Sequence, residues 1–281
     1  MNINLNNQYN LINNNINIDI INTSIGKIIK IDNFLKNPYI FYDFYYKNNL
    51  INIPHSKHIY NAYPGKQFNL NNTLSNELNN FTDKYIKNLL KLEYLNNIQD
   101  SNYYFRVINK KNSQLHFENI LPHNHIAHSN KYYLKGISSC IYLCNKNKKS
   151  SGTSFYKENI KVRGELLNKR IKYNKTIPIL NNDAFNYDKY KFESEYLKKL
   201  LRNPRYNADI DNILYTKIYS VESQFNRCIF FQNDIFHNFD LNHNYYNNIS
   251  NMDNKRLTIV GVTYYDNIFK NDNDINYLYD Y

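Results

Sequence analysis

The spacing of apolar residues changes partway along the chain. Before residue 100 the clearest pattern is helical, since apolar residues recur every three or four positions over residues 82–95 and predict a helix there. Asn37 followed by Pro38 predicts the start of an earlier helix, because asparagine caps helix N-termini and proline fits the first turn. Residues 27–32 predict a short strand between the N-terminus and that helix.

From residue 103 onward, short alternating runs rich in Ile, Val, Tyr, Phe and Thr predict β-strands. These runs are YYFRVINK (103–110), GISSCIYLC (136–144), GTSFYK (152–157), NRCIFFQ (226–232) and RLTIVGVTYYD (256–266). Turn residues such as Asn, Lys, Ser and Gly separate them. The predicted helices come first in the chain and most predicted strands come after them. This order favours one α+β domain whose sheets form a sandwich or jelly roll.

Two segments depart from this pattern. Residues 1–22 alternate Asn and Ile with little else, which fits either a strand or a frayed lead-in. Residues 158–212 are mostly polar with one helical stretch, KFESEYLKKLLR, and look like an insertion rather than a second core. The predicted organisation is therefore a low-complexity lead-in over 1–22 and a single domain over 23–281, with an insertion at about 158–212.

The composition narrows the class of protein. A chain of 281 residues with 42% apolar content is long enough to bury a core, and it has no run of about 18 apolar residues that could cross a bilayer. The first residues lack the pattern of a signal peptide. Three cysteines are an odd number that fits a reducing compartment, and Cys140 and Cys144 are expected to pack in the core. A soluble cytoplasmic protein without membrane contact is the expectation.

The net charge of +11 raises the question of a nucleic-acid partner. The excess is mostly scattered lysine in a chain also rich in Asn, Ile and Tyr, as the codons of an AT-rich genome would produce. No recognition motif accompanies the charge, so a basic nucleic-acid-binding module stays a possible but unsupported alternative.

Histidines gather in PHNHIAH, where His123, His125 and His128 fall within six positions. Residues two apart on a strand share a face, so His123 and His125 can bind one ion side by side. His237 stands at the end of a later apolar run. Such a set is typical of a facial triad that leaves three positions open on Fe(II). The alternatives are a solvated loop without an ion, and His128 in place of either neighbour.

Further polar residues accompany the last strands. Arg256 and Thr258 lie on one face of a predicted strand, and an arginine beside a hydroxyl suits a bidentate grip on a small dicarboxylate. A surface ion pair is the alternative for Arg256. Asn226 and Arg227 are interpreted as structural, a turn followed by an ion-paired or packed arginine.

With these residues in view, the chain resembles the 2-oxoglutarate- and iron(II)-dependent oxygenase superfamily, in the group related to prolyl hydroxylases. It is most similar to a branch seen in bacteria and their viruses and catalogued as a domain of unknown function. The matching motifs, in order, are IDNFLKNPYIFYDF, AYPGKQF, LPHNH, CIYLC with SGTSFYK, FNRCIFFQNDIFHNF and KRLTIVGVTYY. The resemblance implies a double-stranded β-helix core, a jelly roll of the cupin type, with N-terminal helices packed on it.

The resemblance also implies roles for individual residues. His123 and His237 would be metal ligands, and Arg256 with Thr258 beside it would hold the far carboxylate of 2-oxoglutarate. Fe(II), 2-oxoglutarate and molecular oxygen would be required, and the substrate would be a small molecule or a peptide that the sequence does not identify.

One position departs from the family pattern. The family has a carboxylate two residues after the first histidine, where this chain has His125, although a second register would align His128 to Asn130 with the motif. A third imidazole favours zinc or copper more than a carboxylate does. A catalytically degenerate jelly-roll protein with a binding or structural role is therefore the main alternative to an oxygenase.

Overall fold

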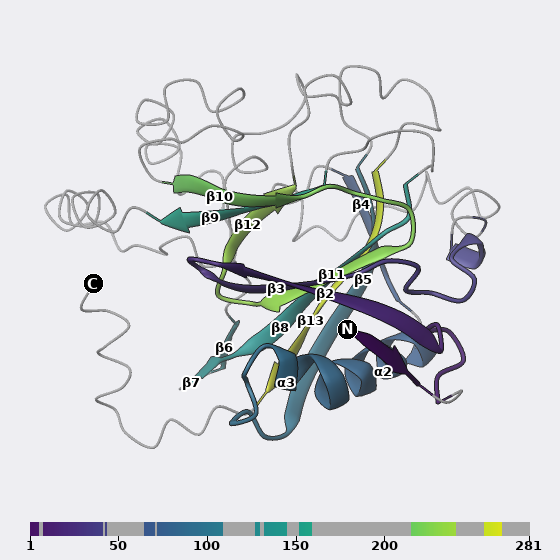
Figure 1. Cartoon of the computed structure of the whole chain (residues 1–281), viewed down its shortest axis with the longest axis horizontal. Coiled ribbons are helices and arrows are strands. Elements are labelled where there is room, and N and C mark those ends of the chain that lie inside the picture. The colour runs from purple at the N-terminus through teal and green to yellow at the C-terminus, as the bar shows by residue number, and fades with distance from the viewer. Residues whose placement is uncertain are drawn as a thin grey trace, which may run out of the picture.

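The computed structural model describes residues 1–5, 8–41, 43, 65–70, 72–108, 127–129, 132–144, 152–158, 215–239 and 256–265. These residues form three layers, with helices on one face of a large sheet and a small sheet over its other face (Figure 1). The expected β-rich α+β class is confirmed. No helix of the described ranges is long and apolar enough to span a membrane.

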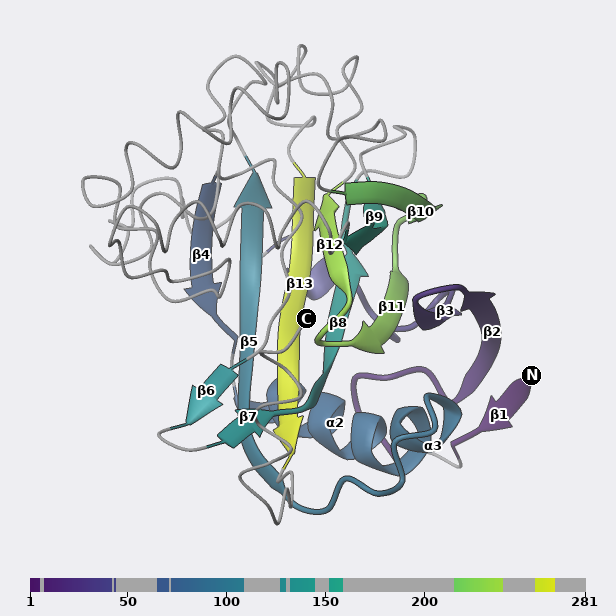
Figure 2. The same ribbon diagram turned by 90° about the vertical axis from the view of Figure 1, so that its left-hand side faces the viewer.

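All strand neighbours are antiparallel. The large sheet has the order β1 (Asn2–Asn4), β2 (Asn15–Thr23), β3 (Gly26–Ile31), β11 (Arg227–Gln232), β8 (Gly136–Tyr142), β13 (Arg256–Tyr265), β5 (Ile98–Ile108) and β4 (Gly65–Asn69). The small sheet has the order β10 (Tyr215–Val221), β9 (Thr153–Glu158) and β12 (Phe236–Phe239), and β6 (Ala127–Ser129) pairs with β7 (Tyr132–Leu134). Figure 2 shows β5, β13 and β8 side by side.

The strands predicted from the five alternating runs are confirmed, as β5, β8, β9, β11 and β13, and the predicted strand at 27–32 is β3. Of the two alternatives for residues 1–22, the structure has strands. β2 crosses the expected boundary at residue 23 and pairs with β3 in the large sheet. The expected insertion lies outside the described residues beyond Glu158.

The predicted helix over 82–95 begins and ends too late. The helical segment consists of α2 (Asn72–Phe81), the π-helical turn η2 (Thr82–Ile86) and α3 (Lys87–Leu89). Its first half buries Leu74, Leu78 and Phe81 at helical spacing, but the asparagines between them hide that spacing in the sequence. It ends early because Lys91 adopts a left-handed conformation with φ of 61°. A helical turn at residues 39–41 follows Pro38, as predicted.

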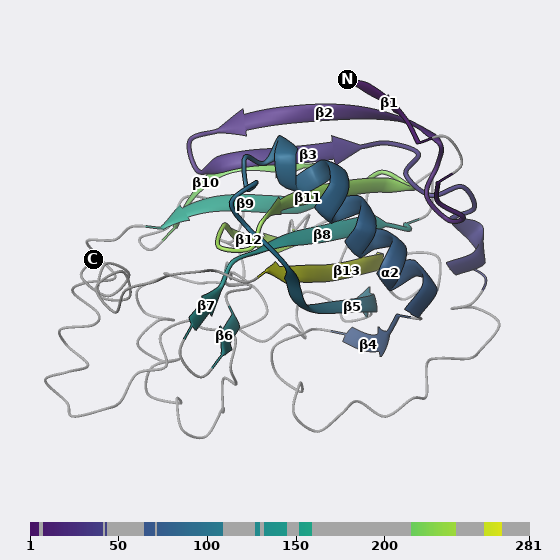
Figure 3. The same cartoon turned by 90° about the horizontal axis from the view of Figure 1, so that it is seen from below.

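The two faces of the large sheet bury different sets of residues. The helices cross one face (Figure 3), and there Phe34, Phe81 and Phe230 pack with ring centroids 5.3 to 5.8 Å apart. We call the face beneath the small sheet the inner face. The buried apolar cluster between the two sheets consists of Ile28, Cys140, Tyr142, Phe155, Val221, Ile229, Phe231 and Ile235.

The chain passes repeatedly between the two sheets after residue 136. β8 lies in the large sheet, β9 and β10 in the small one, β11 in the large one, β12 in the small one and β13 in the large one. Because of this path, neighbouring strands of the small sheet come from distant parts of the sequence. Through this path, residues of β12 and residues at the start of β13 face the same space between the two sheets.

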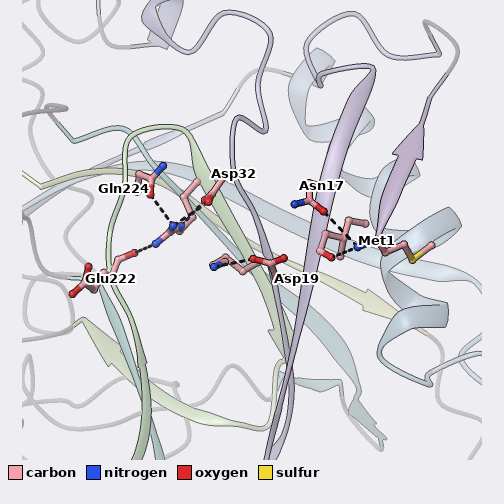
Figure 4. A network of polar contacts seen from close by, with 9 residues as sticks. Met1, Asn17, Asp19, Asp32, Glu222 and Gln224 are labelled. Atoms are coloured by element: carbon pink, nitrogen blue, oxygen red, sulfur yellow. Dashed lines mark hydrogen bonds and ion pairs between the residues drawn. The ribbon is translucent and has the colours of Figure 1, made fainter.

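Asn226 and Arg227 have the structural role predicted for them. Asn226 adopts φ of 62° in the turn before β11, and its amide exchanges two hydrogen bonds of 2.8 Å with the backbone of Leu35. Arg227 donates to both carboxylate oxygens of Asp32, at 2.6 and 3.1 Å (Figure 4). These contacts fasten the start of β11 to the segment after β3.

Candidate functional site

His237 faces the inter-sheet space from β12. It lies directly opposite Phe155 of β9, which belongs to the inter-sheet cluster. The ring of Phe231 from the large sheet lies 4.6 Å from the His237 ring, centroid to centroid, and 4.9 Å from that of Phe155. His237 is 7% exposed. Its imidazole is therefore held between the two sheets by aromatic neighbours.

The orientation of the imidazole is fixed by the backbone. Nδ1 of His237 lies 2.9 Å from the carbonyl oxygen of Ile235. A carbonyl oxygen only accepts, so Nδ1 carries the proton and donates it. In this tautomer the lone pair is on Nε2, the nitrogen through which such a histidine would bind a metal ion, and a backbone carbonyl on the other nitrogen is the usual support of a ligating histidine.

Arg256 enters the same inter-sheet space from β13. It is 4% exposed, and its Nη2 donates to the carbonyl oxygen of Gly152 at 3.2 Å. Its guanidinium carbon lies 5.6 Å from the centre of the Tyr142 ring. The Tyr142 hydroxyl in turn lies 2.6 Å from the hydroxyl of Thr153 on the small sheet. Arg256 is thus a buried arginine between the sheets and does not lie on the surface.

Thr258 supplies a buried donor beside this arginine. It is fully buried, and its hydroxyl has no hydrogen-bond partner among the described residues. A buried hydroxyl left without a partner costs about 1–3 kcal/mol. A ligand that accepts a hydrogen bond from Thr258 would remove that cost, so the residues present fit an anion at this position.

β9 connects the two ends of the site. Phe155 lies opposite His237, while Thr153, two residues earlier on the same face, reaches Tyr142 beneath Arg256. The metal-ligand candidate and Arg256 therefore both lie beside β9, with His237 opposite Phe155 and Arg256 near Gly152.

Three inner-face residues beside this site were not predicted as part of it. Thr258 lies directly opposite Tyr142 on β8 and directly opposite Arg106 on β5, and Cys140 is the next inner-face residue of β8. The alternation of the strand runs indicates which residues share a face. The pairing register that puts Arg106 and Tyr142 beside Thr258 is a contact between distant segments, which no local pattern contains.

The cysteines are buried as expected. Cys144 is 3% exposed, and its thiol lies 3.6 Å from the carbonyl oxygen of Leu257. Burial raises the pKa of Cys140 to about 11, against the opposing effect of Arg256 and, more weakly, of Arg106. The Cys140 thiol therefore stays protonated at neutral pH and acts as a small neutral neighbour of both arginines.

The histidines predicted to bind a metal ion together with His237 lie in a segment that the structure describes only in part. His123 and His125 lie outside the described residues, and His128 is described only as part of β6, opposite Tyr133 of β7. Among the residues that the structure does describe, no three His, Cys, Asp or Glu side chains gather as a metal site. The triad of His123, His125 and His237 stays a prediction.

The chain belongs to a family of unknown function, DUF6445, whose pattern matches residues 13–262. The match begins before β2 and extends into β13, so it includes the small sheet, most of the large sheet, His237, Arg256 and Thr258. No curated protein matches the chain.

Proposed function

We propose that this member of the DUF6445 family is an iron(II)- and 2-oxoglutarate-dependent oxygenase of the hydroxylase type. The observation that carries the proposal is the inter-sheet space itself. His237, whose Nδ1 is hydrogen-bonded to the backbone, lies opposite Phe155 of β9, and Arg256 donates to the carbonyl oxygen of Gly152 just before that strand. A potential metal ligand and a potential carboxylate-binding arginine thus face the same side of β9.

The path of the chain supports the fold that such an oxygenase would have. From β8 to β13 the chain alternates between two antiparallel sheets, as it does in a double-stranded β-helix. The helices pack on the outer face of the large sheet, away from the space between the sheets (Figure 3). We therefore propose a jelly-roll core of the cupin type with N-terminal helices on its outer face.

Different residues of the chain would have different roles at this site. Nε2 of His237, together with His123 and His125 or His128, would hold the metal ion, and open positions on iron would activate oxygen in the presence of 2-oxoglutarate. Arg256 would pair with the far carboxylate, and Thr258 would donate its hydroxyl to the same group. The rings of Tyr142, Phe155 and Phe231 would exclude water from the space between these ends.

The first test is anaerobic addition of Fe(II) and 2-oxoglutarate, followed by visible absorption. We expect the weak charge-transfer band of iron chelated by a keto acid. His237→Ala should abolish the band, and Arg256→Ala should weaken it at a fixed 2-oxoglutarate concentration. His128→Ala serves as the matched histidine variant, since the band should persist if His123 and His125 are the other ligands. Thermal unfolding of each variant establishes that it is folded.

A variant at His125 distinguishes an active oxygenase from a catalytically degenerate relative. His125→Asp restores the carboxylate of the family pattern and should tighten Fe(II) binding, because an anionic oxygen ligand offsets the charge of the ion. A band in both the wild type and this variant supports the proposal. A band in His125→Asp alone would mean that the natural chain has left oxygenase chemistry and keeps the fold for binding.

A further inference from the structure

Arg106 brings a second guanidinium to the inner face of the large sheet. Along β5, Tyr103, Phe105 and Val107 are buried in the core on the helix side, so Arg106 projects from the opposite face. Its partner across the strand pair is Thr258. Residues directly opposite in an antiparallel pair have Cβ atoms about 4.5–5.5 Å apart, so the two side chains are immediate neighbours.

Thr258 therefore lies between two arginines. Arg256 precedes it by two positions on the same face of β13, about 7 Å away along the strand, and Arg106 flanks it from β5. Both guanidinium groups also act on one thiol, because each opposes the rise in the pKa of Cys140 that burial causes. The register places Arg106 directly across from Thr258, and the shared effect on Cys140 indicates that both guanidinium groups lie over the same part of the inner face.

The two arginines differ in their surroundings. Arg256 is almost fully buried under the small sheet, whereas Arg106 is partly exposed. The Arg106 guanidinium carbon lies 5.7 Å from the centre of the Tyr104 ring, a contact that holds its side chain along the sheet surface. A ligand anion beside Thr258 would thus meet one guanidinium from the enclosed side and one from the open side.

We propose that Arg106 is a second anion-binding residue of the site and that it holds the far carboxylate of 2-oxoglutarate jointly with Arg256 and Thr258. The inference rests on the proposed function for the identity of the ligand. The Thr258 hydroxyl, fully buried and without a partner, marks where the carboxylate lies. Two guanidiniums and a hydroxyl offer enough donors for all lone pairs of a carboxylate, so the site should strongly favour ligands that carry an anion at that end.

The test compares two keto acids that differ only at the far end. Calorimetric titration under argon measures binding of 2-oxoglutarate and of 2-oxobutanoate, which lacks the far carboxylate, to protein with and without Fe(II). Arg106→Met should weaken 2-oxoglutarate binding about ten- to a hundred-fold, the usual effect of losing a charge-assisted hydrogen bond. Binding of 2-oxobutanoate should stay within about twofold. Arg106→Lys, which keeps the charge and loses the planar fork, should lie between.

Lys30→Met is the matched control for loss of a positive charge. Lys30 projects from the same face of β3, three strands away from β13, and pairs with Asp19 at 2.9 Å (Figure 4). Its removal should leave both titrations unchanged. A general effect of net charge on ligand affinity would instead appear in this variant too and would overturn the assignment of Arg106.

The remaining outcomes separate this inference from the proposed function. If Arg256→Met loses 2-oxoglutarate and Arg106→Met does not, the oxygenase proposal stands and the role of Arg106 is wrong. If Arg106→Met weakens both keto acids equally, Arg106 only supports the structure. If 2-oxoglutarate binds without iron and depends on Arg106, but iron does not bind, the anion site is supported and the oxygenase proposal fails.

Discussion

The two faces of the large sheet make different use of the same strands. On β13, Leu257 and Ile259 point into the core on the helix side, whereas Arg256 and Thr258 point into the inter-sheet space. The helix side is filled by leucine, isoleucine and phenylalanine that contact one another closely. The inner face is equally buried at Thr258, yet it contains a hydroxyl without a partner.

This difference separates the face that stabilises the fold from the face that we propose binds a ligand. Burial of apolar surface is the main favourable contribution to folding, and the helix side provides most of it. Burial of Arg256 and of the Thr258 hydroxyl opposes folding unless other groups compensate. For the Thr258 hydroxyl, which has no hydrogen-bond partner among the described residues, the proposed ligand would remove that cost.

The largest effect should come from the helix side. Ile259→Ala removes a side chain that is 1% exposed, and it should lower the free energy of unfolding by about 2–5 kcal/mol. Urea denaturation followed by circular dichroism measures the change. The dissociation constant for 2-oxoglutarate of the folded variant should be unchanged. A loss of well under about 1 kcal/mol would show that the helix side does not carry the stability assigned to it.

Alkaline pH should lower the free energy of unfolding through buried residues on both faces of the large sheet. Burial raises the pKa of Cys140 to about 11 on the inner face and raises the pKa of Tyr103 and Tyr265 on the helix side. The folded state holds these protons more tightly than the unfolded state does. The stabilisation is thus complete below the unfolded pKa, about 9 for a cysteine and 10 for a tyrosine, and is lost as pH rises through the folded pKa.

Urea denaturation in reducing buffer at several pH values between about 8 and about 11 tests this dependence. Cys140 alone should contribute a loss on the order of 2–3 kcal/mol across its window, and Cys140→Ala should flatten the pH profile by that amount. Stability that stays constant up to about pH 11 would mean that these groups are accessible to solvent.

Local sequence patterns predicted many, but not all, of the features that distinguish the two faces. The alternation in RLTIVGVTYYD placed Arg256 and Thr258 on one strand face, and the apolar run before His237 predicted the strand β11. Both features depend on neighbours in the chain. His237 was expected at the end of that strand but lies within the next one, β12, in the small sheet. The helix α2 was missed because Leu74, Leu78 and Phe81 are separated by asparagines, and tertiary burial rather than helix propensity stabilises that segment.

The proposed role of Arg106 could not be predicted from the same reasoning. In the sequence it is one polar residue in an alternating run, with no sign that it would lie across from Thr258, 152 positions later. Strand register depends on contacts over the whole sheet and shifts every side chain if it changes by one residue. Conversely, Asn226 could be interpreted as a turn residue because its left-handed backbone is a local property. Its hydrogen bonds to Leu35 and the ion pair of Arg227 with Asp32 join distant segments, and no local pattern contains those partners.

The smallest effect gives the sharpest comparison, because two buried threonines occupy opposite faces of β13. Thr263 lies on the helix side, and its hydroxyl is 2.6 Å from the Tyr103 hydroxyl and donates to Asn79 at 2.9 Å. Thr258 lies on the inner face without a partner. Thr263→Val should cost about 1–3 kcal/mol, whereas Thr258→Val should leave stability unchanged or raise it by up to about 1 kcal/mol.

The two variants should differ in the opposite way in their affinity for 2-oxoglutarate. Thr258→Val should weaken 2-oxoglutarate several-fold, roughly the effect of one lost hydrogen bond, while Thr263→Val should bind as the wild type does. Urea denaturation and calorimetry on the same two proteins measure both quantities. If Thr258→Val is destabilised like Thr263→Val and binds normally, its hydroxyl serves the fold, and the inner face would not differ from the helix side in the way proposed. A stabilised Thr258→Val with weakened binding would mean that the hydroxyl is maintained for the ligand at a cost to the fold.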